Sequence, residues 1–180
     1  MNTNADRALT TAPLTAGQRV AMHYFVAAMV LFFAQILFGM ISGMQYIMPD
    51  LFYNQLDFSV ARMVHINAMV VWLLFGFIGS IYWLVEDEAE TDLVGAKLAT
   101  VKFWILTSAV AVVVLVYLFV QIGPGELKSI WLINEGREYI EAPRWADIGI
   151  VFCVLVFFYN VAATFMKGRW SGISGVLVLD

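Results

Sequence analysis

An arginine and a histidine lie three residues apart at the start of a long apolar run, residues 58–90, FSVARMVHINAMVVWLLFGFIGSIYWLVEDEAE. On a helix this spacing places Arg62 and His65 on one face, one turn apart. An ionisable side chain inside a membrane span is costly and normally has a partner, so it indicates a functional site. A neutral imidazole in an apolar setting must hydrogen-bond or bind a metal, because an unpaired buried polar group costs about 1–3 kcal/mol.

A haem iron is a natural partner for this imidazole. Arg62 would lie about 4.5 Å further toward the surface, which suits a guanidinium that pairs with a haem propionate. The alternative is a histidine that only hydrogen-bonds across a helix bundle, and such histidines are at least as common. The adjacent arginine favours an anionic cofactor, because an arginine at this depth also requires a counter-charge.

The helical face of His65 continues through Met69, Trp72, Gly76 and Gly79. The two glycines lie about 16 Å or more from His65 along the helix axis, too deep to make room for a macrocycle there. Helix packing is therefore the better interpretation of both. Trp72, at about 10 Å, would reach only the edge of such a ring.

A second candidate segment is NEGREYIEAPRW, residues 134–145. In a helical turn, Glu135 and Glu138 would share one face. Two carboxylates there could bind a hard cation through oxygen or carry protons toward a buried site. The alternative is a solvated amphipathic loop.

The composition indicates what must hold these residues. Of 180 residues, 62% are hydrophobic and 13% charged, and the mean hydropathy is +0.82, which indicates an integral membrane protein. The net charge of −4 excludes a basic nucleic-acid surface. Cys153 is the sole cysteine, so the chain has no cysteine pair for zinc, redox chemistry or covalent haem attachment.

Four apolar stretches are long enough to cross a membrane, after a polar N-terminal tail at residues 1–19. Residues 171–180 begin a further apolar segment that is too short to span, so the chain looks interrupted, by truncation or by a split gene. The expected spans are residues 20–46, 61–85, 99–122 and 145–166.

Three smaller features lie along these spans. Gly39 and Gly43 have the GxxxG spacing, which is typical of close helix packing. His23, at the start of the first span, is interpreted as an interfacial side chain, with a metal ligand as the alternative. The acidic run at residues 86–92 is expected to be a solvated loop.

The cationic residues assigned to the two sides of the membrane give a weak orientation signal. Counting those near the span ends as well, six lie on the side of the N-terminus and four on the other, which favours a cytoplasmic N-terminus and puts His65 in the outer part of the membrane. The first set is Arg7, Arg19, Lys97, Lys102, Lys167 and Arg169, and the second is Arg62, Lys128, Arg137 and Arg144.

The runs ARMVHIN (61–67), WLLFGF (72–77), EDEAE (86–90) and EGREY (135–139) resemble the large, cytochrome b subunit of bacterial respiratory nitric oxide reductases. The resemblance begins near Val20 and covers only the N-terminal part of that subunit. It implies an all-α membrane protein, a bundle of four transmembrane helices with the start of a fifth, as part of a twelve-helix haem-copper oxidase-like fold.

The resemblance also implies roles for individual residues. His65 corresponds to one axial ligand of the low-spin haem b that relays electrons for reduction of nitric oxide to nitrous oxide, and Arg62 to a residue near the haem propionates. Glu135 corresponds to a calcium-binding glutamate and Glu138 to a residue on a proton route. The implied location is the bacterial cytoplasmic membrane, crossed several times.

This chain departs from the family in what it lacks. It contains two histidines, whereas the family's second haem b ligand, its high-spin haem b ligand and its non-haem iron ligands come from later spans. We therefore expect no catalytic residue in this chain and no activity without a C-terminal half of the subunit. The first span near residue 20 favours a separate, membrane-anchored cytochrome c subunit as partner over the fused form of quinol-using relatives.

Two other functions remain open. The chain could be a non-catalytic helical membrane subunit that stabilises or assembles a larger respiratory complex, with His65 as a hydrogen-bonded core residue. It could also be a fragment of an oxygen-reducing haem-copper oxidase. The Glu135 and Glu138 pair counts against the latter.

Overall fold

The computed structural model describes residues 13–52, 55–122 and 144–168, and in these ranges the chain is helical apart from short caps and turns. The helices are α2 (Ala16–Ile47), α3 (Phe58–Ala89), α4 (Ala96–Ile122) and α5 (Arg144–Lys167). All four are long and apolar enough to cross a membrane. The all-α class predicted from the apolar stretches is confirmed, and the chain is a multi-pass membrane protein.

The helices run past the expected apolar spans because polar caps set their ends. Thr15 caps α2 through a capping box with Gln18, and Asp57 caps α3 by accepting a hydrogen bond from the Ser59 amide. At its other end α3 ends at Ala89 and is followed by the C-cap residue Glu90, whose backbone is left-handed with φ 47°. The caps lie outside the apolar stretches, where the backbone groups at helix ends need polar partners.

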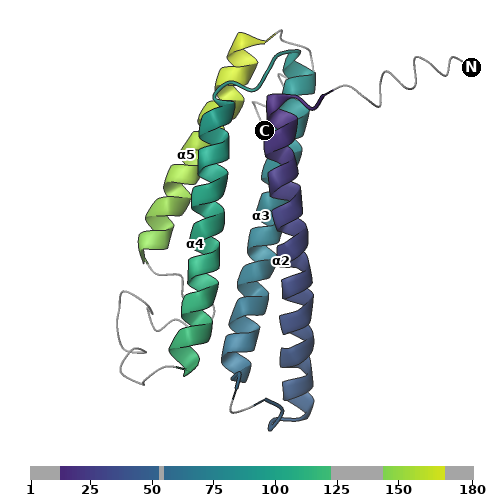
Figure 1. Cartoon of the computed structure of the whole chain (residues 1–180), viewed down its shortest axis with the longest axis vertical. Coiled ribbons are helices and arrows are strands. Elements are labelled where there is room, and N and C mark those ends of the chain that lie inside the picture. Colours follow the sequence, from purple (N-terminus) through teal and green to yellow (C-terminus); the bar gives the residue numbers. More distant parts are fainter. Residues whose placement is uncertain (1–12, 53–54, 123–143, 169–180) are drawn as a thin grey trace, which may run out of the picture.

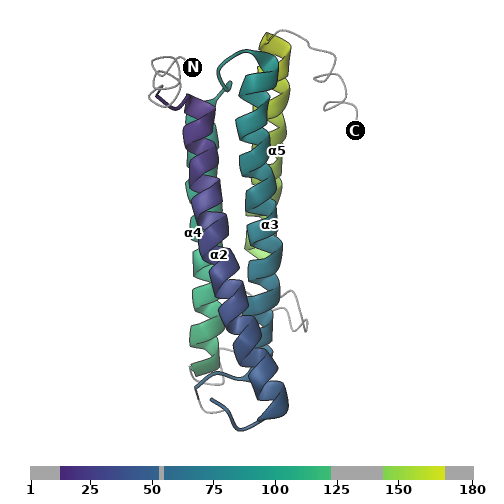
Figure 2. The same cartoon turned by 90° about the vertical axis from the view of Figure 1, so that its right-hand side faces the viewer.

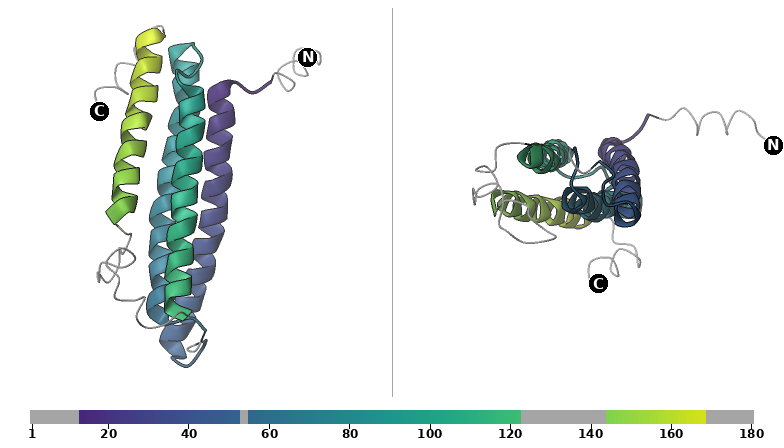
Figure 3. Two further views of the ribbon diagram at one scale, coloured as in Figure 1. Left: turned by 60° about the vertical axis from the view of Figure 1, so that its left-hand side comes forward. Right: turned by 90° about the horizontal axis from the view of Figure 1, so that it is seen from below.

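The helices form two antiparallel pairs, α2 with α3 and α4 with α5 (Figures 1 and 2). The view along the bundle in Figure 3 shows the two pairs side by side. In Figure 1 the start of α2, the α3–α4 connection and the end of α5 lie at the upper end of the bundle. The start of α3 and the end of α4 lie at the lower end, so His65 and the α3–α4 connection are at opposite ends.

The interior of the upper half is aromatic. Tyr24 and Phe75 are fully buried and meet edge to face, with ring centroids 5.3 Å apart. Phe103 of α4 meets Tyr24 in the same way at 4.9 Å. Such edge-to-face pairs add to the stabilisation from burial alone. A smaller cluster at the lower end comprises Val60, Val64, Val113 and Tyr117.

The outer faces of the helices are apolar as well. In the most apolar stretch of α2 only 11% of the residues are buried, and in α3 33%. Large side chains such as Val30, Phe33 and Phe77 are 64%, 64% and 67% exposed. A bilayer, or further helices of the same assembly, can cover such faces, whereas water would penalise them.

The glycines behave less uniformly than their spacing predicts. Gly79 packs closely on Phe25 and Tyr24 of α2, as expected for helix packing. At Gly76 and Gly43, an added Cβ would have no atom of the described residues within 4 Å, so no helix of the described ranges packs closely on either glycine. Residues 134–143, with Glu135 and Glu138, and residues 171–180 lie outside the described ranges.

Candidate functional site

Arg62 and His65 lie in the first two turns of α3, on the lower end of the bundle. His65 is seven residues into the helix, about 10 Å along its axis. Both side chains are half-buried. The Arg62 guanidinium lies 5.8 Å from the centroid of the Phe58 ring, a distance suited to a cation–π contact.

The His65 imidazole points to α2. Its Nδ1 lies 2.7 Å from the carbonyl oxygen of Gln35. Because a carbonyl can only accept, Nδ1 donates this hydrogen bond and carries the ring proton in the neutral form. Nε2 then holds the free lone pair, and no described residue hydrogen-bonds to it.

Gly39 lies one helical turn beyond Gln35 on α2 and faces the same ring. A Cβ at this position would stand 2.6 Å from both Nδ1 and Cε1 of His65. The close approach predicted from the GxxxG spacing therefore exists at Gly39, but it is an approach to an imidazole and not to a helix backbone.

The remaining residues on the predicted His65 face also turn toward α2 or outward. Trp72 packs edge to face on Phe32, with ring centroids 5.1 Å apart, and its buried Nε1 has no hydrogen-bond partner among the described residues. Met69 is 38% exposed. Only part of this face, at His65, Trp72 and Gly79, therefore forms the seam between α2 and α3, with the imidazole at its polar end.

His23 is exposed near the start of α2, with its ring centroid 5.5 Å from that of Phe103 and 6.3 Å from that of Trp104. This surrounding is typical of an interfacial aromatic side chain. The distance along α2 from His23 to Gly39, which touches His65, is about 24 Å. The two histidines therefore cannot bind one metal ion together.

A buried lysine was not expected. Lys102 is fully buried in α4, and its Nζ donates a hydrogen bond of 2.7 Å to the Tyr82 hydroxyl. The same nitrogen lies 5.3, 4.6 and 4.9 Å from the ring centroids of Tyr24, Tyr82 and Phe157. Counting Lys102 among the loop cations was wrong, and the orientation signal falls to five against four.

Two polar residues of α5 extend this polar cluster, which we define as Tyr82, Lys102, Asn160 and Thr164. Asn160 accepts from the Tyr82 hydroxyl at 3.1 Å and donates to the carbonyls of Val94 and Gly95 at 2.8 and 3.2 Å. Thr164 accepts from the Val94 amide at 2.9 Å. The cluster therefore ties α5 to the α3–α4 connection.

Glu86 was expected in a solvated loop, and that expectation is wrong for this residue. It is only 6% exposed, and its carboxylate accepts hydrogen bonds from the Gly17 amide at 2.8 Å, the Leu93 amide at 2.7 Å and the Thr15 hydroxyl. Two of these donors belong to the start of α2, where the helix dipole favours an anion. The acidic run gave no signal for which carboxylate turns inward.

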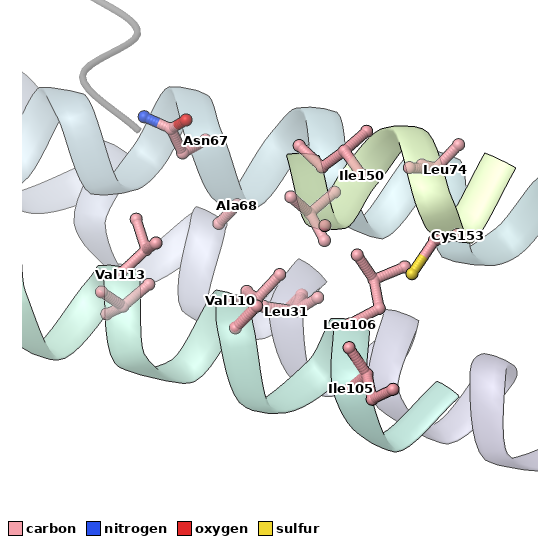
Figure 4. Close-up of a pocket in the computed structure, with 14 residues that line it drawn as sticks. Leu31, Asn67, Ala68, Leu74, Ile105, Leu106, Val110, Val113, Ile150 and Cys153 are labelled. Carbon is pink, nitrogen blue, oxygen red and sulfur yellow. The ribbon is translucent and has the colours of Figure 1, made fainter. Parts of the chain in front are cut away.

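An apolar cavity of about 120 Å³ lies between the helices. Its lining includes Asn67 and Ala68, which follow His65 by two and three residues on α3. Figure 4 shows side chains of α3, α4 and α5 around it, together with Leu31 of α2. Asn67 is its main polar lining residue, and the Asn67 amide donates a hydrogen bond of 2.9 Å to the Met63 carbonyl of its own helix. A cavity of this kind suits a small apolar molecule.

Within the described ranges, no three histidine, cysteine, aspartate or glutamate side chains lie close enough together to hold a metal ion. A metal ion bound at His65 would therefore need its other ligands from outside these ranges. Glu135 and Glu138, the expected calcium and proton-route residues, lie outside the described residues.

Comparison with known proteins agrees with this arrangement. Residues 19–178 match the family model described as cytochrome c and quinol oxidase polypeptide I. The chain is 44% identical over 163 residues to the B subunit of nitric oxide reductase from Stutzerimonas stutzeri. This alignment covers 89% of this chain and 34% of that protein. It is 28% identical over 116 residues to cytochrome c oxidase subunit 1 of Rhodobacter capsulatus, covering 63% of this chain and 16% of that protein.

The chain spans about a third of the length of the first of these relatives and less of the second. Its resemblance to the N-terminal part of the nitric oxide reductase large subunit is confirmed, and haem is a cofactor of this family. The match of the family model to most of the chain establishes that it belongs to the cytochrome c and quinol oxidase polypeptide I family, the haem-copper oxidases.

Proposed function

We propose that this chain is the N-terminal portion of a respiratory nitric oxide reductase large subunit and that His65 is one axial ligand of its low-spin haem b. The observation that carries the proposal is the state of the imidazole. Its Nδ1 donates to the Gln35 carbonyl, which leaves the Nε2 lone pair for a metal. Histidines that ligate metals commonly have this second hydrogen bond.

The residues present fit a haem at this end of the bundle. The His65 side chain is half-buried in an apolar seam, and Arg62 lies one turn nearer the helix end, as a propionate partner would. When bound, the haem would supply reversible one-electron transfer. The chain's own contribution is to hold the ligand nitrogen, to keep the ring in one tautomer and to offset the propionate charge with Arg62.

The chain is not competent alone under this proposal. Its two histidines cannot provide the second haem b ligand, the high-spin haem b ligand and the ligands of a non-haem iron. Those would come from the remainder of the large subunit, and electrons from a membrane-anchored cytochrome c subunit. The 44% identity to a nitric oxide reductase large subunit, against 28% to an oxidase subunit, supports this branch of the family.

Further parts of the proposal concern the segment at residues 134–143. We assign Glu135 to a calcium site and Glu138 to a proton route at the outer surface, on the basis of their resemblance to the family pattern. The N-terminus would face the cytoplasm, in the inner membrane of a bacterium. The weak excess of cations on the N-terminal side agrees with this orientation.

The test uses the chain coproduced with a large-subunit remainder that bears the other histidines, purified in detergent. A reduced-minus-oxidised spectrum should show low-spin haem b, and His65→Ala should abolish that signal. His23→Ala is the matched control, since it removes the chain's other histidine from an exposed site near the opposite end of α2. It should leave the haem spectrum unchanged.

The alternative of a non-catalytic helical subunit also accounts for a hydrogen-bonded His65. Under that alternative the purified assembly contains no haem, or His65→Ala leaves the low-spin signal intact while the stability of the bundle falls. Either result would overturn the ligand assignment. Reduction of oxygen but not nitric oxide by the haem-loaded assembly would favour the oxidase alternative.

A further inference from the structure

We infer that one face of α2 positions His65 as a ligand: the Gln35 carbonyl holds the imidazole by its Nδ1, and Gly39 provides the space in which the ring lies. The inference rests on the proposed haem role of His65 and deepens it. Gln35 and Gly39 are four residues apart, so both lie on the same side of α2. Neither touches the iron in this scheme, so both are positioning residues.

The hydrogen bond fixes two properties of the ring. It sets the tautomer, because the carbonyl oxygen requires a proton on Nδ1. It also fixes the rotation of the ring about its bond to Cβ, since a 2.7 Å contact to a helix carbonyl allows little freedom. A donated hydrogen bond from the second nitrogen also makes the ligating nitrogen more basic.

Gly39 excludes every larger residue while the ring keeps this position. A Cβ there would stand 2.6 Å from Nδ1 and Cε1, whereas carbon atoms in contact are about 3.5–4.0 Å apart. A methyl group at Gly39 would therefore displace the ring by about 1 Å. The three atoms nearest to the position all belong to the His65 ring, so the imidazole and not a helix backbone must move.

A displacement of this size matters for a metal ligand. Binding sites need their donors held within about 0.5 Å and 10–20° of the productive geometry. A ring moved by about twice that distance would lose the Gln35 hydrogen bond or tilt against the haem plane. The expected effect is therefore on the haem signal and not primarily on the stability of the bundle.

The chain offers a matched control on the same helix. Gly43 is one turn further along α2, and a Cβ there would have no atom of the described residues within 4 Å. Gly43→Ala makes the same chemical change, with the same gain in helix propensity, but without contact to His65.

The experiment compares Gly39→Ala, Gly43→Ala and the unaltered chain, each coproduced with the histidine-bearing remainder of the large subunit. The readouts are haem b content per protein and the electron paramagnetic resonance g-values of the oxidised low-spin haem, which report the orientation and basicity of the axial imidazoles. Gly39→Ala should shift the g-values and lower haem retention, on the order of tenfold in haem affinity, as for other residues behind metal ligands. Gly43→Ala should match the unaltered protein.

A second variant separates ring space from folding. In His65→Gly, free imidazole added to the medium should restore the low-spin spectrum by entering the vacated position. Adding Gly39→Ala to this variant should weaken imidazole binding, on the order of tenfold, whereas adding Gly43→Ala should not. Equal imidazole affinity in the two double variants would overturn the role of Gly39.

The outcomes distinguish this inference from the proposed function. If the unaltered assembly contains low-spin haem and His65→Ala abolishes it, the ligand assignment is established on its own. If Gly39→Ala then gives the same g-values and haem content as Gly43→Ala, the positioning inference alone is refuted. If the unaltered assembly contains no haem b, the proposed function fails, and the positioning inference, which rests on it, fails with it.

Discussion

Glu86 is predicted to anchor the first turn of α2 to the end of α3. Its Oε1 accepts the Gly17 and Leu93 amides, and its Oε2 accepts the Thr15 hydroxyl. In Glu86→Ala, two backbone N–H groups lose their acceptor, at about 1–3 kcal/mol each. The total cost for the two groups is then about 2–6 kcal/mol. Because water can reach a helix end more easily than the bundle interior, we expect the free energy of unfolding to fall by an amount near the lower end of this range, about 3 kcal/mol.

Glu86→Gln should be much milder. The amide oxygen can take the place of Oε1 and keep both backbone hydrogen bonds, while the amide nitrogen faces the Thr15 oxygen. What is lost is the charge assistance and the favourable interaction with the α2 dipole, about 1 kcal/mol in total. Asp87→Asn is the matched control, because Asp87 is exposed in the same acidic run and should change stability by less than about 0.5 kcal/mol.

The measurement is denaturant unfolding in detergent, followed by helical circular dichroism, together with hydrogen exchange at single amides. The Gly17 and Leu93 amides should exchange faster in Glu86→Ala than in Asp87→Asn. If Glu86→Ala unfolds at the same denaturant concentration as Asp87→Asn, and the Gly17 and Leu93 amides keep their protection from exchange, the anchoring role of Glu86 is wrong.

Two further pairs of substitutions test the packing between the helix pairs. Lys102→Met should change the free energy of unfolding by no more than about 1 kcal/mol, because it removes a buried charge while the Tyr82 hydroxyl keeps its hydrogen bond to Asn160. Lys102→Ala should lower the free energy of unfolding by about 2–5 kcal/mol, because it leaves a cavity. Unfolding in detergent measures both variants, and equal losses would contradict this reasoning. Gly168→Ala should destabilise the contact of α5 with α3, since its Cβ would strike the Ala89 backbone, and Gly149→Ala, with open space around it, is the control. Equal thermal midpoints for these two variants would refute this contact.

The helices were predictable because apolar length is a local property of the sequence. The expected span at residues 61–85 lies inside α3, which runs on to Phe58 and Ala89, next to its caps at Asp57 and Glu90. The placement of Arg62 and His65 on one helix followed equally from their spacing. These features require no knowledge of which helices are neighbours.

What the sequence could not provide were contacts between helices. Lys102 looked like a loop cation, because nothing near it in sequence indicates that rings from α2, α3 and α5 enclose its ammonium group. Glu86 looked solvated for the same reason, since its partner Gly17 lies 69 residues away. The Gly39 contact with His65 depended on the rotation of α2 against α3, which a GxxxG spacing does not specify.

The polar cluster has a consequence for how the chain enters the membrane. Lys102 contacts Tyr82, 20 residues earlier, whereas Asn160 binds Tyr82 across 78 residues. When α4 is synthesised, α2 and α3 are already present, and the rings of Tyr24 and Tyr82 can shield the Lys102 ammonium group. The ammonium group is therefore not exposed to lipid before α5 is inserted. Asn160 then arrives last and closes the α3–α4 connection, which makes the insertion of α5 the step that completes this half of the bundle.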